Sequence, residues 1–294
     1  PGTGKTMIAR RVATILPSLS RRRRLEVMAI HSLLQETGLQ ALLPPVRSPH
    51  HSASLEGIIG GGSAALPGEI SLAHGGLLLL DEALEFGASV LQSLREPLES
   101  GAVRIVRAEY QTWYPARFTL LMTSNLCPCG GLGSDFHRCS CVASEIVRYW
   151  RRLGEALMDR IEVRAYLSGA EPGRQREEAL PWDPREWSSA SMAESVAEAR
   201  ERSRSRLADV EEETNAEIPA GKLERVCHLS TALEGLLRKR CREARLSLRG
   251  EHAVRRVART LADLAGEEEI GEAELRQAID LRTQGNLEKI LQQN

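Results

Sequence analysis

The sequence has little lysine, few aromatic residues and no long apolar run. Only four of its 39 basic residues are lysines, and Lys5 is the only lysine before position 222. The 40 acidic residues bring the net charge to −1, which excludes a polycation that binds nucleic acid over its whole surface. The longest strongly apolar stretch, 77–80, is far shorter than the roughly 20 residues that span a bilayer. We therefore expect a soluble protein without a membrane partner, in which any nucleic-acid contact is local.

An amino-terminal targeting signal is also missing. The chain opens Pro1-Gly2-Thr3-Gly4 without an initiator methionine or an apolar leader, and we expect it to be a fragment of a longer protein. The six cysteines are clustered rather than spread as a disulfide framework. This usage favours a reducing, cytoplasmic compartment, where close cysteine pairs bind metal more often than they form disulfides.

The spacing of apolar residues predicts an α/β fold. Short apolar segments at 77–80 and 118–122 predict strands buried in a parallel sheet, and a hairpin is expected over 103–114. Helical spacing occurs before, between and after these strands, over 6–16, 25–34, 89–98, 223–237 and 254–264. The chain length fits about two domains. We expect an α/β domain over 1–167, a charged linker or helical segment over 168–222 and a small all-α domain over 223–294.

The opening residues match the second half of a phosphate-binding loop, G-x-x-x-x-G-K-[ST]. In this motif, backbone N–H groups and a helix N-terminus hold phosphates while the lysine reaches the β and γ oxygens. The matching residues, expected to bind the nucleotide, are Gly2, Thr3, Gly4, Lys5 and Thr6. A chance turn is the alternative. The isolation of Lys5 favours the loop, because lysine is retained where a compact charge on a flexible stem is needed.

Two acidic residues, Asp81 and Glu82, end the predicted strand 77–80. An aspartate in this position can hold Mg²⁺ together with Thr6, and Glu82 would then polarise the attacking water. Two solvated acids that cap a strand are the alternative interpretation. The second strand runs into Asn125, which could orient water against the γ-phosphate or could belong to an ordinary turn.

An arginine and a group of cysteines complete the candidate chemistry. Arg160 stands between apolar neighbours, which suits an arginine finger that acts on a neighbouring subunit, with a surface ion pair as the alternative. Four thiols in one short stretch, with His137 between the pairs, have the composition of a tetrahedral zinc site: Cys127, Cys129, Cys139 and Cys141. Reduced thiols without metal are the alternative there. Cys227 and Cys241 follow the apolar pattern and are expected in a core.

Two basic features are candidates for contact with an anionic partner. Residues 21–24 are four consecutive arginines, expected just before an apolar helix, where such a run is usually a solvated segment. The hairpin carries cations and a ring that can stack on single-stranded nucleic acid, and packing within the hairpin is the alternative. These hairpin residues are Arg104, Arg107, Trp113 and Arg117.

Taken together, the chain resembles the magnesium-chelatase-like subfamily of AAA+ ATPases, and in particular its ComM-type bacterial members. The stretches that carry the resemblance are 47–51, 58–62, 67–74, 94–98, 125–130 and 257–264. The resemblance implies an AAA+ core followed by a helical lid, in which Lys5 and Thr6 belong to Walker A and Asp81 and Glu82 to Walker B. Further roles implied by position are sensor 1 for Asn125, the finger for Arg160 and sensor 2 for Arg256.

The resemblance also implies partners and a function. ATP and Mg²⁺ would be the cofactors, with Zn²⁺ at the cysteines, and the subunits would form a homo-oligomeric ring, a hexamer, that remodels DNA by branch migration in natural transformation. Relatives of this type carry a further amino-terminal domain and the first half of the phosphate loop. Two other functions stay open: a chelatase-type motor subunit that drives metal insertion, and a nucleotide-binding or zinc-stabilised DNA-binding module without turnover.

Overall fold

The computed structural model describes residues 3–34, 43–106, 111–133, 138–167, 187–208 and 212–284. Gly2, Arg107 and His137 therefore lie outside the described residues. The chain forms two compact units, and the change from the first to the second falls between Met158 and Asp159. We call them the core unit and the helical unit. This organisation, an α/β part followed by an all-α part, confirms the predicted fold class.

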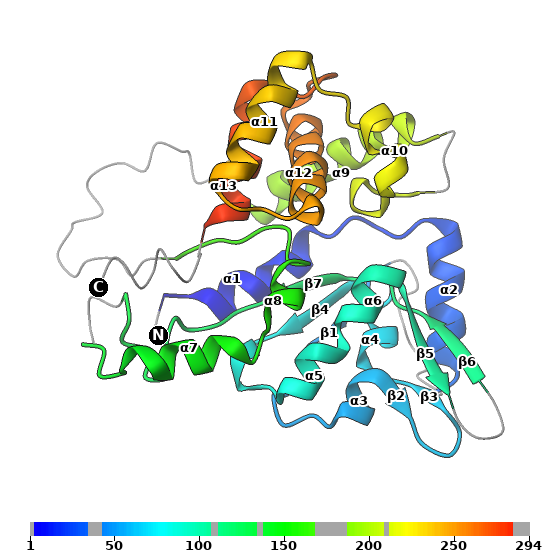
Figure 1. The fold of residues 1–294 in the computed structure, drawn as a ribbon. Helices are drawn as coiled ribbons and strands as arrows, with labels where there is room; N and C mark the ends of the chain where they lie inside the picture. Colours follow the sequence, from blue (N-terminus) through cyan, green and yellow to red (C-terminus); the bar gives the residue numbers. More distant parts are fainter. Residues whose placement is uncertain are drawn as a thin grey trace. The chain divides into compact units, whose positions relative to one another are not determined.

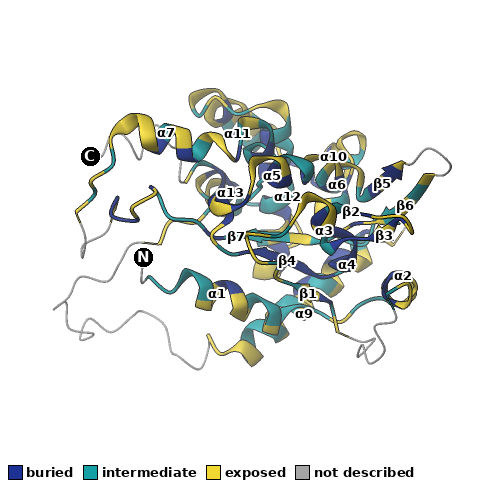
Figure 2. Ribbon diagram, turned by 90° about the horizontal axis from the view of Figure 1, so that it is seen from below, coloured by how far each residue is buried: buried dark blue, intermediate teal, exposed yellow. Residues whose placement is uncertain are grey.

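A parallel sheet organises the core unit (Figure 1). Its central strand β4 (Leu77–Leu80) pairs with β1 (Val46–Arg47) on one side and with β7 (Thr119–Met122) on the other. All four leucines of β4 are buried, as a strand covered on both faces requires (Figure 2). Gly76 precedes β4, and a Cβ at that position would lie 1.9 Å from the carbonyl oxygen of Pro45, so only glycine allows this approach to β1. The two strands predicted from apolar runs are thus β4 and β7.

Helices and two small hairpins surround this sheet. The opening helix is α1 (Lys5–Val12), continued by the 3-10 turn η1 (Ala13–Ile15). The antiparallel pair β5 (Ala102–Val106) and β6 (Gln111–Pro115) confirms the expected hairpin. The other elements of the core unit are α2 (Arg21–Ser32), α3 (Leu55–Ile59), β2 (Gly60–Gly61), β3 (Leu66–Pro67), α4 (Glu69–Leu72), η2 (Ala83–Glu85), α5 (Ala88–Ser93), α6 (Arg95–Ser100), α7 (Ala143–Arg151) and α8 (Glu155–Met158).

Two expectations for these helices are corrected. The helix expected over 89–98 is divided into α5 and α6, because Pro97 has no N–H to donate to the carbonyl of Ser93 and its ring crowds that group. The arginine run does not precede a helix but forms the first turn of α2. Ser20 caps this helix by accepting a hydrogen bond from the backbone N–H of Arg23 over 3.1 Å.

A buried polar group connects α2 with the segment that precedes β4. The ring of His74 is 1% exposed, and its Nε2 lies 2.9 Å from a carboxylate oxygen of Glu26. The other nitrogen, Nδ1, accepts a hydrogen bond from the backbone N–H of Arg117. This contact requires the tautomer in which Nε2 carries the proton and donates it to Glu26. Burial lowers the pKa of His74, so the neutral ring is the native form.

The helical unit is built around α12 (Leu248–Ala265). Helix α9 (Ser189–Arg206), which lies in the range expected to be a linker or helical segment, packs against α12 and belongs to this unit. The remaining elements are η3 (Asn215–Glu217), α10 (Ala220–Val226), α11 (Thr231–Glu243) and α13 (Glu272–Thr283). Cys227 and Cys241 are buried in the apolar core here, as expected. Within the described ranges, no helix combines the length and apolar character needed to cross a bilayer.

Candidate nucleotide-binding site and thiol cluster

A cavity of about 370 Å³ lies in the core unit where β4 and β7 end and α1 begins. Ligands of parallel α/β sheets bind at this edge, outside the carboxyl ends of the strands. Three segments that are distant in sequence line the cavity, namely 3–7, 81–82 and 123–125. The described residues of the core unit that we expected to touch phosphate, magnesium or the attacking water are all among them: Thr3, Gly4, Lys5, Thr6, Asp81, Glu82 and Asn125.

The first segment places a helix N-terminus and an ammonium group at the cavity. Gly4 precedes α1 with a left-handed φ of 77°, a conformation that side chains rarely adopt. The first N–H groups of a helix have no partner within the helix and favour an anion in front of them. Lys5 Nζ donates to Asn125 Oδ1 over 3.1 Å and to Thr3 Oγ1 over 3.4 Å. Both of these acceptors are neutral, so they hold the ammonium group without cancelling its charge.

Asp81 accepts two hydroxyl hydrogen bonds at the end of β4. Thr6 Oγ1 donates to Asp81 Oδ1 over 3.0 Å, and Thr123 Oγ1 donates to the same oxygen over 2.5 Å. Two adjacent oxygen ligands of an octahedral Mg²⁺, each about 2.1 Å from the ion, lie about 3.0 Å apart. The observed spacing of the Thr6 and Asp81 oxygens therefore fits a shared magnesium ion.

Glu82 has an unusual backbone conformation, with φ 53° and ψ 48°. Left-handed backbone is unfavourable for a side chain of this kind and persists where the surroundings impose it, often at functional sites. Thr123 imposes it here, because its Oγ1 accepts the N–H of Glu82 over 3.1 Å and its carbonyl accepts the N–H of Ala83 over 2.8 Å. Glu82 is exposed and is one of the residues that line the cavity.

Thr123 thus contacts Asp81 and the backbone of Glu82, a role that the sequence analysis missed. The position of Thr123 in the sequence could have indicated this role. Thr123 directly follows the second buried strand, and the carboxyl ends of adjacent parallel strands meet at one edge of the sheet, so Thr123 is expected near Asp81.

The two arginines expected at the nucleotide, Arg160 and Arg256, lie in the helical unit. Arg160 is in the segment 159–164, and its neighbours in sequence are held by Arg282 of α13. The guanidinium of Arg282, only 1% exposed, donates to the carbonyl oxygens of Asp159 and Ile161. Sequence reasoning missed this role of Arg282, for which the local pattern gives no signal.

Arg256 has partners of its own within the helical unit. Its Nη1 lies 3.2 Å from Glu162 Oε1, and its Nε and Nη2 donate to the carbonyl of Ile218. Burial raises the pKa of Glu162, and the ion pair with Arg256 opposes that effect. The residue expected as sensor 2 is therefore joined to the same segment that carries Arg160.

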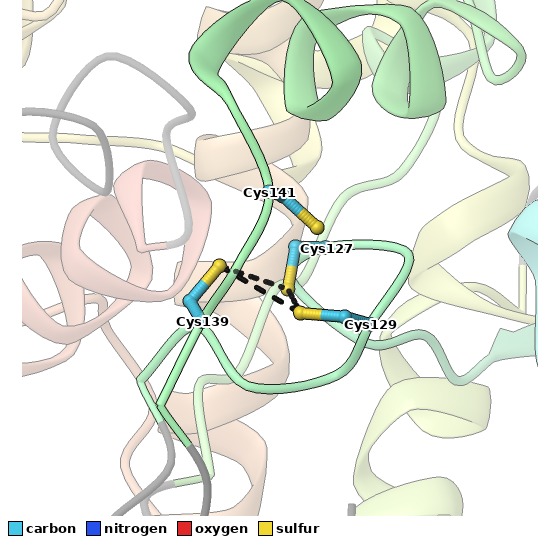
Figure 3. A group of neighbouring side chains, drawn as sticks. All are labelled: Cys127, Cys129, Cys139 and Cys141. Carbon is cyan, nitrogen blue, oxygen red and sulfur yellow. Dashed lines mark hydrogen bonds between the residues drawn. The ribbon is translucent and has the colours of Figure 1, made fainter.

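The four cysteines between β7 and α7 converge (Figure 3). All four sulfur atoms lie within 4.8 Å of one another, and we call this group the thiol cluster. The Sγ atoms of Cys127 and Cys129 are 3.4 Å apart, and Cys139 Sγ is 3.7 Å from each of them. Backbone N–H groups of Ser140 and Gly131 lower the pKa of Cys129 to about 5. This shift favours the thiolate, the form that binds metal, at Cys129, whereas burial raises the pKa of Cys139.

The hairpin of β5 and β6 presents a cation and an aromatic ring together. The guanidinium carbon of Arg104 lies 5.2 Å from the centre of the Trp113 ring, within the range of a cation–π interaction. Trp113 is 54% exposed although it is a large apolar side chain. The adjacent Tyr114 instead anchors the hairpin, since its hydroxyl donates to the carbonyl of Ala65 over 2.8 Å.

Family models match both the α/β part and the all-α part of the chain. Residues 1–174 match the family model for magnesium chelatase, subunit ChlI, and residues 186–282 match the model for the ChlI C-terminal region. Among curated proteins, the chain is 40% identical over 289 residues to an uncharacterised protein of Mycobacterium tuberculosis. It is 37% identical over 288 residues to YifB of Escherichia coli K12, and 36% identical over 284 residues to the competence protein ComM of Haemophilus influenzae.

These alignments cover 96–97% of the chain but 54–56% of the relatives. The chain thus spans a little over half the length of the curated relatives that it matches. Since the two family models together account for most of the chain, it belongs to the magnesium chelatase ChlI family and is similar to the members named YifB and ComM.

Proposed function

We propose that the protein is an ATPase of the AAA+ type that binds ATP and Mg²⁺ in the cavity of the core unit. The observation that carries this proposal is the convergence of a helix N-terminus, an ammonium group, a hydroxyl, two carboxylates and an amide on one cavity. Phosphoryl transfer to water needs these groups, because its catalysis consists mainly of positioning and of stabilising negative charge.

Each residue has a distinct role in this mechanism. Lys5 and the first N–H groups of α1 bind the β and γ phosphates. Thr6 and Asp81 hold Mg²⁺, which when bound neutralises charge on the phosphates. Glu82 accepts a proton from the attacking water, and its imposed backbone conformation fixes the direction of its carboxylate. Asn125 exchanges its hydrogen bond with Lys5 for one with the phosphate or the water.

The arginines of the helical unit complete the proposal. Arg160 acts on the nucleotide of a neighbouring subunit, and Arg256 binds the nucleotide as sensor 2. Head-to-tail contacts of this kind close into rings, and we propose a hexamer in the cytoplasm. The cofactors of this assembly are ATP and Mg²⁺, and the thiol cluster adds a candidate Zn²⁺ site.

The substrate of the motor is DNA in this proposal, and the work done is branch migration during natural transformation. The name of the competence protein ComM supports it, as does the exposed pair of Arg104 and Trp113. An aromatic ring beside a cation suits single strands, because every base offers a face on which to stack. A net charge of −1 argues against binding over the whole surface, so the proposed contacts are local, as on this hairpin.

The deciding experiment measures phosphate release by the whole natural protein and by its Glu82→Gln variant. We expect the substitution to retain ATP binding and to lower kcat at least about 100-fold, as the loss of a general base does. Glu85→Gln, a neighbouring exposed carboxylate outside the cavity, is the matched control and should keep its activity. Turnover that survives Glu82→Gln contradicts the mechanism. Tight ATP binding without any turnover in the unmodified protein supports instead a module that binds nucleotide without hydrolysis.

The match to the magnesium chelatase family favours a second candidate function, that of a motor subunit that drives metal insertion through a partner protein. The two functions differ in what stimulates hydrolysis. Stimulation by single-stranded or branched DNA supports remodelling, whereas stimulation only by a chelatase partner protein supports metal insertion.

A further inference from the structure

The sulfur atoms of the thiol cluster have the spacing of metal ligands rather than of disulfides. Three of their distances are 3.4, 3.7 and 3.7 Å. Four sulfurs placed tetrahedrally around Zn²⁺ at about 2.3 Å would be about 3.8 Å apart, whereas a disulfide brings its two sulfurs to about 2.05 Å. These three distances, and the position of all four sulfur atoms within 4.8 Å of one another, fit a tetrathiolate site.

The backbone around the cluster is arranged to accept a thiolate set. Cys127 Sγ accepts the N–H of Leu132 over 3.2 Å, and Cys129 Sγ accepts the N–H of Gly131 over 3.4 Å. A side chain at Gly131 would collide with the backbone of Cys139, so this turn allows the second cysteine pair to approach the first. Four thiolates so close together repel one another unless a cation neutralises their charge, and sulfur ligands select Zn²⁺ among abundant divalent metals.

The thiol cluster is also directly connected to the nucleotide cavity. Asn125, which accepts the hydrogen bond of Lys5, is separated from Cys127 only by Leu126. The carbonyl of Leu126 in turn accepts a hydrogen bond from Trp150 Nε1 over 2.9 Å. Trp150 belongs to α7, the helix that begins two residues after Cys141. The peptide that carries Asn125 is thus held to α7 at two places, one through the indole and one through the cluster.

We propose that the thiol cluster binds one structural Zn²⁺ and that this ion positions Asn125 at the phosphate cavity. The metal ties the loop after β7 to the start of α7, and it thereby fixes the amide that faces Lys5. The zinc site itself stands on the cluster geometry alone, whereas the positioning role rests on the proposed nucleotide function. Asn125 acts on the nucleotide directly, and the four cysteines act through it.

The first experiment measures the metal content of the whole protein purified without chelator. We expect about one zinc per chain by elemental analysis. The double variant Cys129→Ser and Cys141→Ser should lose this zinc, while Cys241→Ala, which removes a buried thiol outside the cluster, should keep it. Replacement by Co²⁺ should give the intense visible bands of tetrahedral thiolate coordination. Absence of zinc, a disulfide within the cluster or bound iron would each overturn the assignment.

The second experiment tests the positioning role without relying on turnover. Hydrogen exchange is compared between the zinc-loaded protein and protein from which a chelator has removed the metal. We expect faster exchange in the segment 123–132 and unchanged exchange in α12, which serves as the internal reference. Equal exchange in 123–132 would overturn the positioning role, even if zinc is present.

Nucleotide affinity then separates this inference from the proposed function. Removal of zinc should weaken the binding of a fluorescent ATP analogue about tenfold, which is the loss of one hydrogen bond to a charged group. In Asn125→Ala, zinc removal should have little further effect, because both changes act through the same amide. An unchanged affinity after zinc removal contradicts the positioning role. A zinc-loaded protein that does not bind ATP contradicts the proposed function and leaves the metal site supported.

Discussion

Lys5 Nζ and Asn125 Oδ1 lie 3.1 Å apart although they are 120 positions apart in the sequence. This hydrogen bond joins the first residue of α1 to the segment that follows β7, across the cavity. It keeps the ammonium group extended toward the space where phosphates would bind, and a phosphate oxygen can replace the amide as its acceptor. The geometry of the pair therefore organises the site before ligand binding.

The identity of the cation at position 5 should matter for ATP binding. Lys5→Arg preserves the charge but replaces a compact ammonium by a planar fork that does not fit between Thr3 and Asn125. We expect ATP affinity, measured by calorimetry, to fall at least about tenfold. Lys222→Arg, in a partly exposed ion pair with Glu212, is the matched control and should bind ATP normally. Normal affinity in Lys5→Arg would remove the lysine from the proposed mechanism.

The backbone conformation of Glu82 should cost stability. Glycine adopts a left-handed φ freely, so Glu82→Gly should raise the free energy of unfolding by about 0.5–1 kcal/mol while it abolishes hydrolysis. Glu85→Gly, placed in the following 3-10 turn, should instead lower stability by a similar amount. Denaturant titrations of both variants provide the measurement. A loss of stability in Glu82→Gly would show that its side chain contributes more than the strain costs.

The buried ring of His74 should make the core unit sensitive to acid. Because burial lowers its pKa below the ordinary value of 6.5, the unfolded chain binds a proton that the native state resists. The stabilising contribution is complete above pH 6.5 and decreases below it, with a slope of at most about 1.4 kcal/mol per pH unit for one proton. The pKa of Glu26 is also lowered, so protonation of this carboxyl adds to the loss at still lower pH.

Denaturant unfolding at pH 7.5 and 5.5 tests this dependence. His74→Asn should be less stable at pH 7.5 but should lose less stability between the two pH values than the unmodified protein. His50→Asn, which changes an exposed ring, should keep the full pH dependence. Equal pH dependence in all three proteins would assign the effect to other groups.

The hairpin should contribute to DNA binding through Trp113. Trp113→Ala removes an exposed ring and should weaken single-stranded DNA binding by about 1–3 kcal/mol, the contribution of one base stacked on an aromatic side chain. ATP turnover without DNA should not change. Trp187→Ala, which removes an exposed tryptophan of the helical unit, should leave DNA affinity intact. Fluorescence anisotropy with a labelled oligonucleotide would show whether the two variants differ.

Local patterns in the sequence predicted β4, β7 and the β5–β6 hairpin together with the residues that line the cavity, but not the short strands β1, β2 and β3. Leu77–Leu80 is apolar throughout, as a strand buried on both faces must be, and the polar residues that follow each strand meet because parallel strands end at one edge. The contacts of Thr123 with Asp81 and of Arg282 with Asp159 were not predictable in this way. The first contact joins residues separated by 42 positions in the sequence, and the second joins residues separated by 123 positions. No periodicity in the sequence indicates partners so far apart.

The attachment of 159–164 to the helices determines where a recombinant chimera of two relatives could be joined. Asp159 accepts hydrogen bonds from Ser247 and Arg282, and the N–H of Arg164 donates to Leu281. A fusion point after Leu167, the expected end of the first domain, would exchange this segment without its partners and leave the buried guanidinium of Arg282 facing foreign residues. A fusion point between Met158 and Asp159 would transfer the segment and its partners together.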